Sequence, residues 1–261
     1  MLRIENLKKS FGGVAACNDV TLEFATGSLT AVIGPNGAGK TTFFNLMSGA
    51  IPPDSGRVLL DGRDIAGMPA HDIVRAGIAR AFQIASIFPN LTVREALLGA
   101  ANAHSNQHAV MRGRFPLASS HARADDVMAL VGLERQADVL SRNLSHGDQK
   151  LLDVALALVP EPRVLLLDEP TAGMGPEERW QMINTVHSLW SRKKMTLVFI
   201  EHDMDIVFKI AQTIRVLSYG QVLAEGTPEE VRRHPAVIEA YLGHSFEADQ
   251  QDKTASARAP A

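Results

Sequence analysis

The chain has 261 residues, of which 46% are hydrophobic and 21% are charged, as is ordinary for a soluble globular protein. This length suits one large α/β domain, alone or with a smaller subdomain. The formal net charge of −3 gives no general attraction to nucleic acid or anionic lipid, and Cys17, the only cysteine, excludes an internal disulfide. The chain begins without a signal-peptide pattern and has no apolar run of bilayer length. We therefore expect a cytoplasmic protein that reaches a membrane only through a partner.

Strand patterns dominate the first part of the chain. Apolar and polar residues alternate over residues 3–24, with a break at Phe11-Gly12-Gly13. The other elements expected before residue 84 are strands over 29–33, 58–60 and 78–82 and a helix over 69–77. The strands on either side of residues 29–33 could form an antiparallel sheet beside that strand.

The character of the sequence changes at Ile84. Residues 84–144 are expected to form a helical insertion, with helices over 92–103 and 118–131 and a polar, basic surface loop or short helix between them. Strands and helices then alternate, which indicates a mainly parallel sheet covered on both faces. The elements expected here are helices over 148–158, 176–190 and 204–211 and strands over 163–167, 195–200, 213–217 and 221–225. Residues 244–261 are polar and aperiodic, and we predict that this tail is disordered.

The stretch Gly34-Pro35-Asn36-Gly37-Ala38-Gly39-Lys40-Thr41-Thr42 satisfies the phosphate-binding pattern G-x-x-x-x-G-K-[ST]. A strand precedes it and a helix follows, as that pattern requires. Its glycines let successive N–H groups point at phosphate oxygens, and the helix start favours the same anion. Lys40 would reach the β- and γ-phosphates, and the Thr41 hydroxyl would ligate Mg²⁺. The alternative is a glycine-rich turn without a ligand, which we weigh as far less favoured.

Two later strands end in polar side chains. Asp168 and Glu169 close the apolar strand over residues 163–167, at the edge of a parallel sheet where ligands bind. Asp168 could hold Mg²⁺ through water, and Glu169 could polarise the attacking water. As an alternative, the two carboxylates could cap the next helix, although Pro170 follows at once. His202 closes the next strand, level with Glu169, and could donate a hydrogen bond to the γ-phosphate, although a lone histidine is usually structural.

For three further positions, the chemistry of the side chain alone allows two roles. The amide oxygen of Gln83 could complete the Mg²⁺ shell or contact the water, or it could have neither role. Ser145 could begin a helix whose N-terminus binds a second anion, or it could simply cap that helix. Phe11 could stack on adenine or belong to the core.

Together these residues resemble the nucleotide-binding subunits of ABC transporters over nearly all of residues 1–243. The resemblance implies a P-loop NTPase fold of the ABC type: an α/β core with a mainly parallel sheet, an antiparallel β subdomain and a helical subdomain. It implies a nucleotide site of Walker A residues and Phe11, namely Asn36, Gly37, Ala38, Gly39, Lys40, Thr41 and Thr42. It further implies a Walker B motif with catalytic Glu169, a Q-loop glutamine at Gln83 and a switch histidine at His202.

The segment Leu144-Ser145-His146-Gly147-Asp148 resembles the signature motif, in which His146 and Asp148 depart from the usual Leu-Ser-Gly-Gly-Gln. Ser145 and Gly147, which contact phosphate in the family, are present. A second departure is Gly175, where the family's D-loop often has Asn or Asp. The family mechanism implies a head-to-tail dimer that traps two ATP molecules, each between one Walker A loop and the other subunit's signature serine. Hydrolysis then reopens the dimer.

Several motifs narrow the resemblance to the ATP-binding subunits of importers for branched-chain amino acids, urea or short amides, and the polar stretch after Ala103 resembles the longer of the two such subunits. The motifs are Arg80-Ala81-Phe82-Gln83, Phe88-Pro89-Asn90-Leu91-Thr92-Val93, Ala172-Gly173-Met174 and Glu201-His202-Asp203-Met204. The implied partners are permease subunits that dock on residues 83–95, a second ATP-binding subunit (the same chain or a shorter paralogue) and a solute-binding protein. The cofactors would be ATP and Mg²⁺, and the place of action the cytoplasmic face of the membrane.

Other function classes fit less well. A soluble ABC-type ATPase acting on nucleic acid or the ribosome predicts tandem modules or a long coiled-coil insertion, and basic patches. The single module, the short helical insertion and the net charge of −3 count against it. A nucleotide sensor without catalysis would be credible if Lys40 or Glu169 were missing, and both are present. An ATPase subunit of a lipid or polysaccharide exporter shares every catalytic motif, and the resemblance of residues 201–204 and of the insertion after Ala103 favours an importer. The sequence does not identify the solute.

Overall fold

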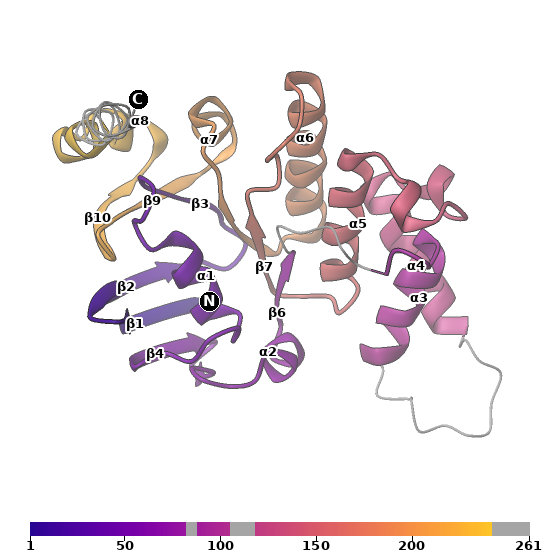
Figure 1. Cartoon of the computed structure of the whole chain (residues 1–261), viewed down its shortest axis with the longest axis horizontal. Helices are drawn as coiled ribbons and strands as arrows, with labels where there is room; N and C mark the ends of the chain where they lie inside the picture. Colours follow the sequence, from indigo (N-terminus) through magenta and orange to yellow (C-terminus); the bar gives the residue numbers. More distant parts are fainter. Residues whose placement is uncertain (82–87, 105–117, 242–261) are drawn as a thin grey trace, which may run out of the picture.

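The structure is a computed structural model that describes residues 1–81, 88–104 and 118–241. Six strands form the central sheet: β3 (Leu29–Ile33), β6 (Ile78–Ala81), β7 (Val164–Asp168), β8 (Thr196–Ile200), β9 (Thr213–Ser218) and β10 (Gln221–Gly226). Their order is β10-β9-β3-β8-β7-β6 (Figure 1). All neighbours are parallel except β10 and β9, so the sheet is mainly parallel as predicted.

A second sheet lies beside the first and is antiparallel throughout, which confirms the antiparallel subdomain. Its strands are β1 (Leu2–Phe11), β2 (Val14–Phe24), β4 (Ser55–Leu60) and β5 (Arg63–Asp64). Their order is β2-β1-β4-β5.

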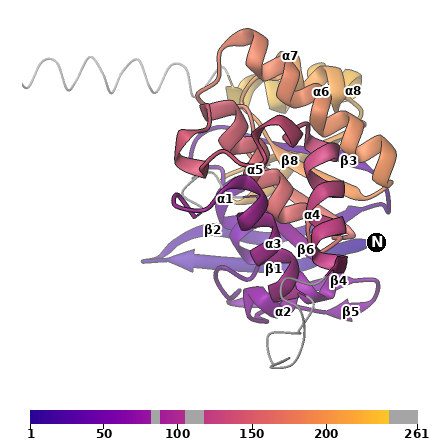
Figure 2. The same ribbon diagram turned by 90° about the vertical axis from the view of Figure 1, so that its right-hand side faces the viewer.

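Helices cover both the sheet faces and one side of the molecule. The α-helices of the described residues include α1 (Lys40–Met47), α2 (Ala70–Ala76), α3 (Val93–His104), α4 (Ala118–Val131), α5 (His146–Leu158), α6 (Pro176–Lys193), α7 (Met204–Ile210) and α8 (Pro228–Arg232), and residues 235–241 are also helical. Two short 3₁₀ turns, Glu134–Gln136 and Ser141–Asn143, lie between α4 and α5. Helices α3 and α4 stand apart from the antiparallel strands, with α5 between them and the central sheet (Figures 1 and 2).

Strands β3, β7 and β8 are buried along their whole length, which explains their largely apolar sequences. Along β7, Leu165 and Leu167 pack into a core shared with α3, α4 and α5, whereas Val164 and Leu166 pack into a core shared with α1 and the antiparallel sheet. The two cores alternate along β7 because successive side chains of a strand point to opposite faces of the sheet. Apolar burial on both sides fixes the register of β7 and so the place of the residues that follow it.

Most expected elements are present, but α5 corrects one boundary. The sequence predicts that this helix starts at Asp148, and the structure starts it at His146. The Ser145 hydroxyl accepts a hydrogen bond from the Asp148 N–H (3.1 Å) and so caps the helix. The cap starts the helix two residues earlier than predicted, although Gly147 is a poor helix former. The end of the strand at Phe82, the start of the helical insertion, the basic loop and the tail over 244–261 lie wholly or largely outside the described residues. The domain boundaries stay a prediction.

Two further features bear on the chemistry of the chain. Cys17 is buried on β2, and burial raises the pKa of its thiol to about 12. Within the part of the chain that the structure describes, no helix combines the length and apolarity needed to cross a bilayer.

Candidate functional site

The phosphate loop joins β3 to α1 and depends on glycine at two close approaches. A Cβ at Gly34 would lie 2.1 Å from the Leu217 carbonyl oxygen, and one at Gly39 would lie 2.1 Å from that of Ala16. Gly39 has a φ of 97° and is the N-cap of α1, with no side-chain cap. The first N–H groups of α1 therefore stay available to an anion.

Lys40 is buried at the centre of this loop, with 6% of its surface exposed. Its ammonium group donates to the carbonyl oxygens of Gly34 (2.6 Å) and Pro35 (3.0 Å). Burial lowers the pKa of Lys40, and the nearby carboxylates of Glu169 and Asp168 partly oppose that shift. The lysine thus carries positive charge into a site that also holds two acids.

An open pocket of about 560 Å³ lies over the loop. It is lined by Ala16, Asn36, Gly37, Ala38, Gly39, Lys40, Thr41, Thr42, Glu169 and His202. The structure thus brings together Asn36–Thr42, Glu169 and His202, which the sequence places far apart. Phe11, Ser145 and Gly147 do not line the pocket, and Gln83 lies outside the described residues.

Glu169 and His202 form a direct contact at the rim of this pocket. The Oε1 atom of Glu169 lies 2.8 Å from Nε2 of His202, and both side chains are partly exposed. The pairing follows from the sheet, because β7 and β8 are parallel neighbours and each residue follows the end of its strand. The Glu169 N–H donates to the Ile200 carbonyl (3.0 Å), and its φ of 49° is uncommon for a residue other than glycine. Such backbone conformations often occur at functional sites.

Asp168 is held by an arginine to which sequence reasoning gave no role. Arg80 on β6 donates to Oδ2 of Asp168 (2.6 Å) and to the side chain of Asn45 on α1 (2.6 Å). The side chain of Asp168 is almost fully buried, and its Oδ1 atom has no hydrogen-bond partner within the described residues. An arginine inside the apolar run Ile78-Ala79-Arg80-Ala81 was the available signal, because a buried cation requires a partner.

Glu201, another residue to which sequence reasoning gave no role, precedes His202. Its side chain is 3% exposed and accepts hydrogen bonds from the N–H and the hydroxyl of Thr171 (3.0 and 2.6 Å). It also accepts one from the His202 N–H (3.2 Å). Glu201 thereby ties the residues after Glu169 to those around His202. A carboxylate directly after an apolar strand could have indicated this link.

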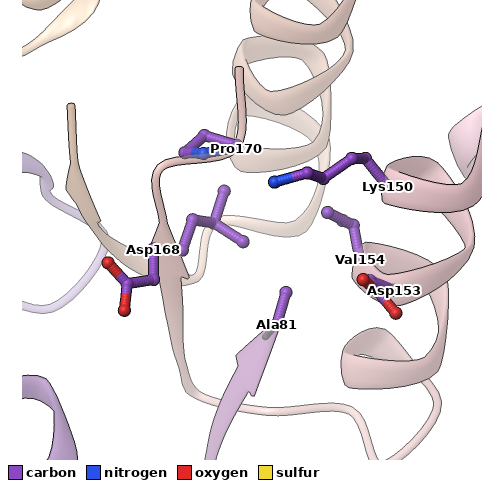
Figure 3. A pocket seen from close by; sticks show the side chains of 7 residues that line it. Ala81, Lys150, Asp153, Val154, Asp168 and Pro170 are labelled. Carbon is purple, nitrogen blue, oxygen red and sulfur yellow. The ribbon is translucent and has the colours of Figure 1, made fainter. Parts of the chain in front are cut away.

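Behind β7 lies a small pocket between that strand and α5 (Figure 3). Lys150 and Asp153 project into it from α5, and Asp168 lies on the other side of β7 with its carboxylate turned away (Figure 3). Lys150 is buried and donates to the Glu169 carbonyl oxygen (3.3 Å). Burial raises the pKa of Asp153 to about 7 against the opposing effect of Lys150, and its Oδ2 atom has no hydrogen-bond partner in the described part of the chain.

The signature residues lie apart from the pocket over the phosphate loop. Ser145 is exposed and caps α5. His146 places Nε2 3.3 Å from the Ala172 carbonyl oxygen. Phe11 lies at the end of β1 with half of its surface exposed, so its ring is available for stacking.

Comparison with known proteins identifies the family. The model of the ABC transporter family matches residues 17–172, and that of the branched-chain amino acid ATP-binding cassette transporter matches residues 221–247. The high-affinity branched-chain amino acid transport ATP-binding protein LivG of Salmonella typhimurium is 38% identical over 251 residues, covering 94% of this chain and 98% of LivG. The corresponding protein BraF of Pseudomonas aeruginosa is 37% identical over 252 residues, with coverages of 94% and 98%.

Solved structures agree with the sequence relatives. A nucleotide-free ATP-binding cassette from an ABC transporter has a TM-score of 0.82 at 30% identity and covers 92% of this chain and 98% of its own. The ADP conformation of the cassette MJ1267 has a TM-score of 0.81 at 30% identity, with coverages of 93% and 98%. The chain belongs to the ABC transporter family, as an ATP-binding subunit of the branched-chain amino acid type that hydrolyses ATP to drive transport.

Proposed function

We propose that the chain powers import of branched-chain amino acids, or of related small polar solutes such as urea and amides, at an ATP site shared by two subunits. The observation that carries this proposal is the contact of 2.8 Å between Glu169 and His202 at the rim of the phosphate-loop pocket. It supplies a base and a hydrogen-bond donor beside the place where the γ-phosphate would lie. The names of LivG and BraF support the solute class.

The loop would bind the phosphates through its N–H groups and Lys40. At present Lys40 donates to two carbonyl oxygens of its own loop, Gly34 and Pro35. Phosphate oxygens would replace these acceptors, so the lysine is already aimed into the loop that would receive the anion. Phe11 would stack on the adenine.

The residues present fit Mg²⁺. The hydroxyl of Thr41 and the carboxylate of Asp168 are oxygen donors of the kind this ion prefers, and Oδ1 of Asp168 is buried without a partner in the described region. Arg80 holds the other oxygen, Oδ2, and so keeps the carboxylate in one orientation. Asp168 would act through water, and Gln83 would complete the set. The ion would neutralise charge on the phosphates.

Glu169 would align and polarise the attacking water. While His202 donates to Glu169, that carboxylate oxygen is occupied. We expect the γ-phosphate to draw the His202 N–H away and so free Glu169 to accept from water. The histidine would then stabilise charge on the phosphate.

Ser145 and Gly147 would serve the other subunit. Neither lines the pocket over their own phosphate loop, whereas Ser145 is exposed at the start of α5. A facing subunit in head-to-tail arrangement, either a second copy or a shorter paralogue, would place its phosphates against this helix start. The pocket is open at present, which suits closure by a partner.

Permease subunits would dock on residues 83–95, at the cytoplasmic face of the membrane. Within this stretch Phe88 is half exposed, with a φ of 52°, and lines a groove of about 560 Å³. The other lining residues are Val74, Ala79, Arg80, Asp153, Leu156, Ala157 and Pro160. An apolar side chain held outward beside an apolar groove suits contact with another protein. A solute-binding protein would complete the importer.

The substitution Glu169→Gln tests the catalytic part of the proposal. It keeps the shape of the side chain but removes the base, so steady ATP hydrolysis should fall by at least about a hundredfold while ATP binding stays intact. Phosphate release and equilibrium binding of a fluorescent ATP analogue measure the two quantities. Hydrolysis near the parent rate would show that Glu169 is not the base.

The direction of transport needs a separate test. The chain is reconstituted in vesicles with permease subunits and a solute-binding protein from the same organism, and uptake of labelled leucine, valine, urea and acetamide is followed. ATP-dependent accumulation of one of these solutes supports an importer. Export of a lipid or a polysaccharide by the same assembly contradicts it.

A further inference from the structure

Two side chains of helix α5 contact the backbone of the segment that carries the catalytic glutamate. We call residues 169–174 the catalytic segment. His146, the first residue of α5, places Nε2 3.3 Å from the Ala172 carbonyl oxygen. Lys150, one turn later, donates to the Glu169 carbonyl oxygen at 3.3 Å. Residues four apart share one face of a helix, so both side chains reach the catalytic segment from the same side.

The catalytic segment is anchored on its other side as well. Glu201 accepts two hydrogen bonds from Thr171. Within the segment, the Ala172 N–H donates to the Glu169 carbonyl (3.1 Å) and the Met174 N–H to that of Thr171 (3.2 Å). The segment is therefore a series of turns held between Glu201 and α5. A displacement of one anchor moves backbone that the other also holds.

The fit between His146 and the segment depends on glycine. Gly173 has a φ of 81°, and a Cβ at this position would lie 3.0 Å from Nε2 of His146. The histidine ring thus occupies space that a side chain at residue 173 would take. His146 and Gly173 form one contact, made by a signature residue and a D-loop residue.

Lys150 reaches the same segment from a buried position. The lysine is 5% exposed and lies beside the ring of Pro170, in the pocket that also holds Asp153 (Figure 3). A buried ammonium group is stable only where it is hydrogen-bonded or paired, so its place against the Glu169 carbonyl is restricted. The two contacts thus differ in burial but join the same helix to the same segment.

We propose that His146 and Lys150 are positioning residues that fix Ser145 relative to Glu169. Glu169 lines the pocket of its own subunit, whereas Ser145 is exposed and would close the pocket of the facing subunit. The contacts of His146 and Lys150 with the catalytic segment therefore link the state of one ATP site to the serine that completes the other. This inference rests on the trans role of Ser145 proposed above. It gives the unusual third residue of the signature motif a definite task, which is to donate Nε2–H to the D-loop carbonyl.

The test uses the full chain with Glu169→Gln, which retains ATP, and measures ATP-driven association with itself and with the second ATP-binding subunit. His146→Ala should weaken association by about three- to tenfold, as expected for the loss of one hydrogen bond. ATP binding by the separate subunit should not change. His146→Gln, whose amide can also donate, should recover most of the loss, which a purely steric role would not predict. His187→Ala, at an exposed histidine of α6, is the control.

A double-mutant cycle with Ser145→Ala decides how His146 acts. If His146 works through Ser145, His146→Ala should have no further effect once Ser145 is removed. An equal loss in both backgrounds, or no rescue by Gln, overturns the inference and leaves the trans site intact. Unchanged association in Ser145→Ala alone instead overturns the shared site and the inference with it. Lys150→Met should show the same dependence on Ser145, and its thermal unfolding reports any loss of folding at this buried position.

Discussion

Two buried carboxylates lie on opposite sides of β7 and meet different surroundings (Figure 3). Asp168 is paired with Arg80 at 2.6 Å. Asp153 has Lys150 nearby, but its pKa is raised to about 7 because burial disfavours the charged form more than the lysine favours it. The same residue type is therefore ion-paired with an arginine on one side of the strand, whereas on the other side burial raises its pKa.

Asp153 makes the stability of the fold depend on pH. Because its folded pKa lies above the usual aspartate value of 3.8, the associated stability is complete below that pH and is lost as the pH rises toward about 7. Asp153→Asn has no proton to lose. The free energy of unfolding of the variant, relative to the parent, should therefore rise by up to a few kcal/mol between pH 4 and pH 8.

Urea unfolding at a series of pH values measures this difference. Asp126→Asn, at an exposed aspartate of α4, is the control and should leave the pH profile of the parent unchanged. Parallel profiles for the parent and Asp153→Asn would contradict the prediction.

At the scale of elements, the phosphate loop depends on how closely it approaches β2. The substitution Gly39→Ala would bring a methyl group against the Ala16 carbonyl oxygen, 2.1 Å from an ideal Cβ, and would also strain a φ of 97°. Gly37→Ala has a similar strain at a φ of 77°, but nothing lies within 4 Å of its Cβ. Thermal unfolding without nucleotide should therefore show a larger loss of stability for Gly39→Ala, by about 1–3 kcal/mol. Equal losses would mean that the contact with β2 is unimportant.

The elements also show what sequence reasoning can reach. The strands predicted over 163–167 and 195–200 could be recognised because their apolar runs, 164–167 and 197–200, are followed at once by charged residues. Parallel strands end at one edge of a sheet, so Glu169 and His202 could be expected at the same level, and they lie 2.8 Å apart. Local pattern and one general rule were sufficient here.

Other contacts were beyond local pattern. The pair formed by Arg80 and Asp168 depends on β6 lying next to β7, although the helical insertion separates them in the chain. The start of α5 depends on the Ser145 cap, against the low helix propensity of Gly147. The bond from Lys150 to the Glu169 carbonyl depends on how α5 packs against β7, for which the sequence has no local signal.

At the scale of the whole molecule, the groove at Phe88 is the surface through which the ATPase would contact the permease subunits. Phe88→Glu places a charge in this apolar groove and should abolish retention of the chain on vesicles that contain the permeases. Its thermal unfolding should stay close to that of the parent, because the ring is half exposed. Tyr219→Glu, at another exposed aromatic residue, is the control in the same co-sedimentation assay. Retention of Phe88→Glu would move the docking surface elsewhere.

The buried thiol of Cys17 has a practical consequence for these measurements. A thiol with a pKa of about 12 and 1% exposure forms almost no thiolate near neutral pH, and alkylating reagents react with thiolate. Since Cys17 is the only cysteine, we expect thiol reagents to leave the chain unlabelled until a further cysteine is introduced. A cysteine introduced at an exposed position of α4 or α6 could carry a spin label or a fluorophore without replacement of the native cysteine. Such a label would report the opening and closing of the proposed dimer.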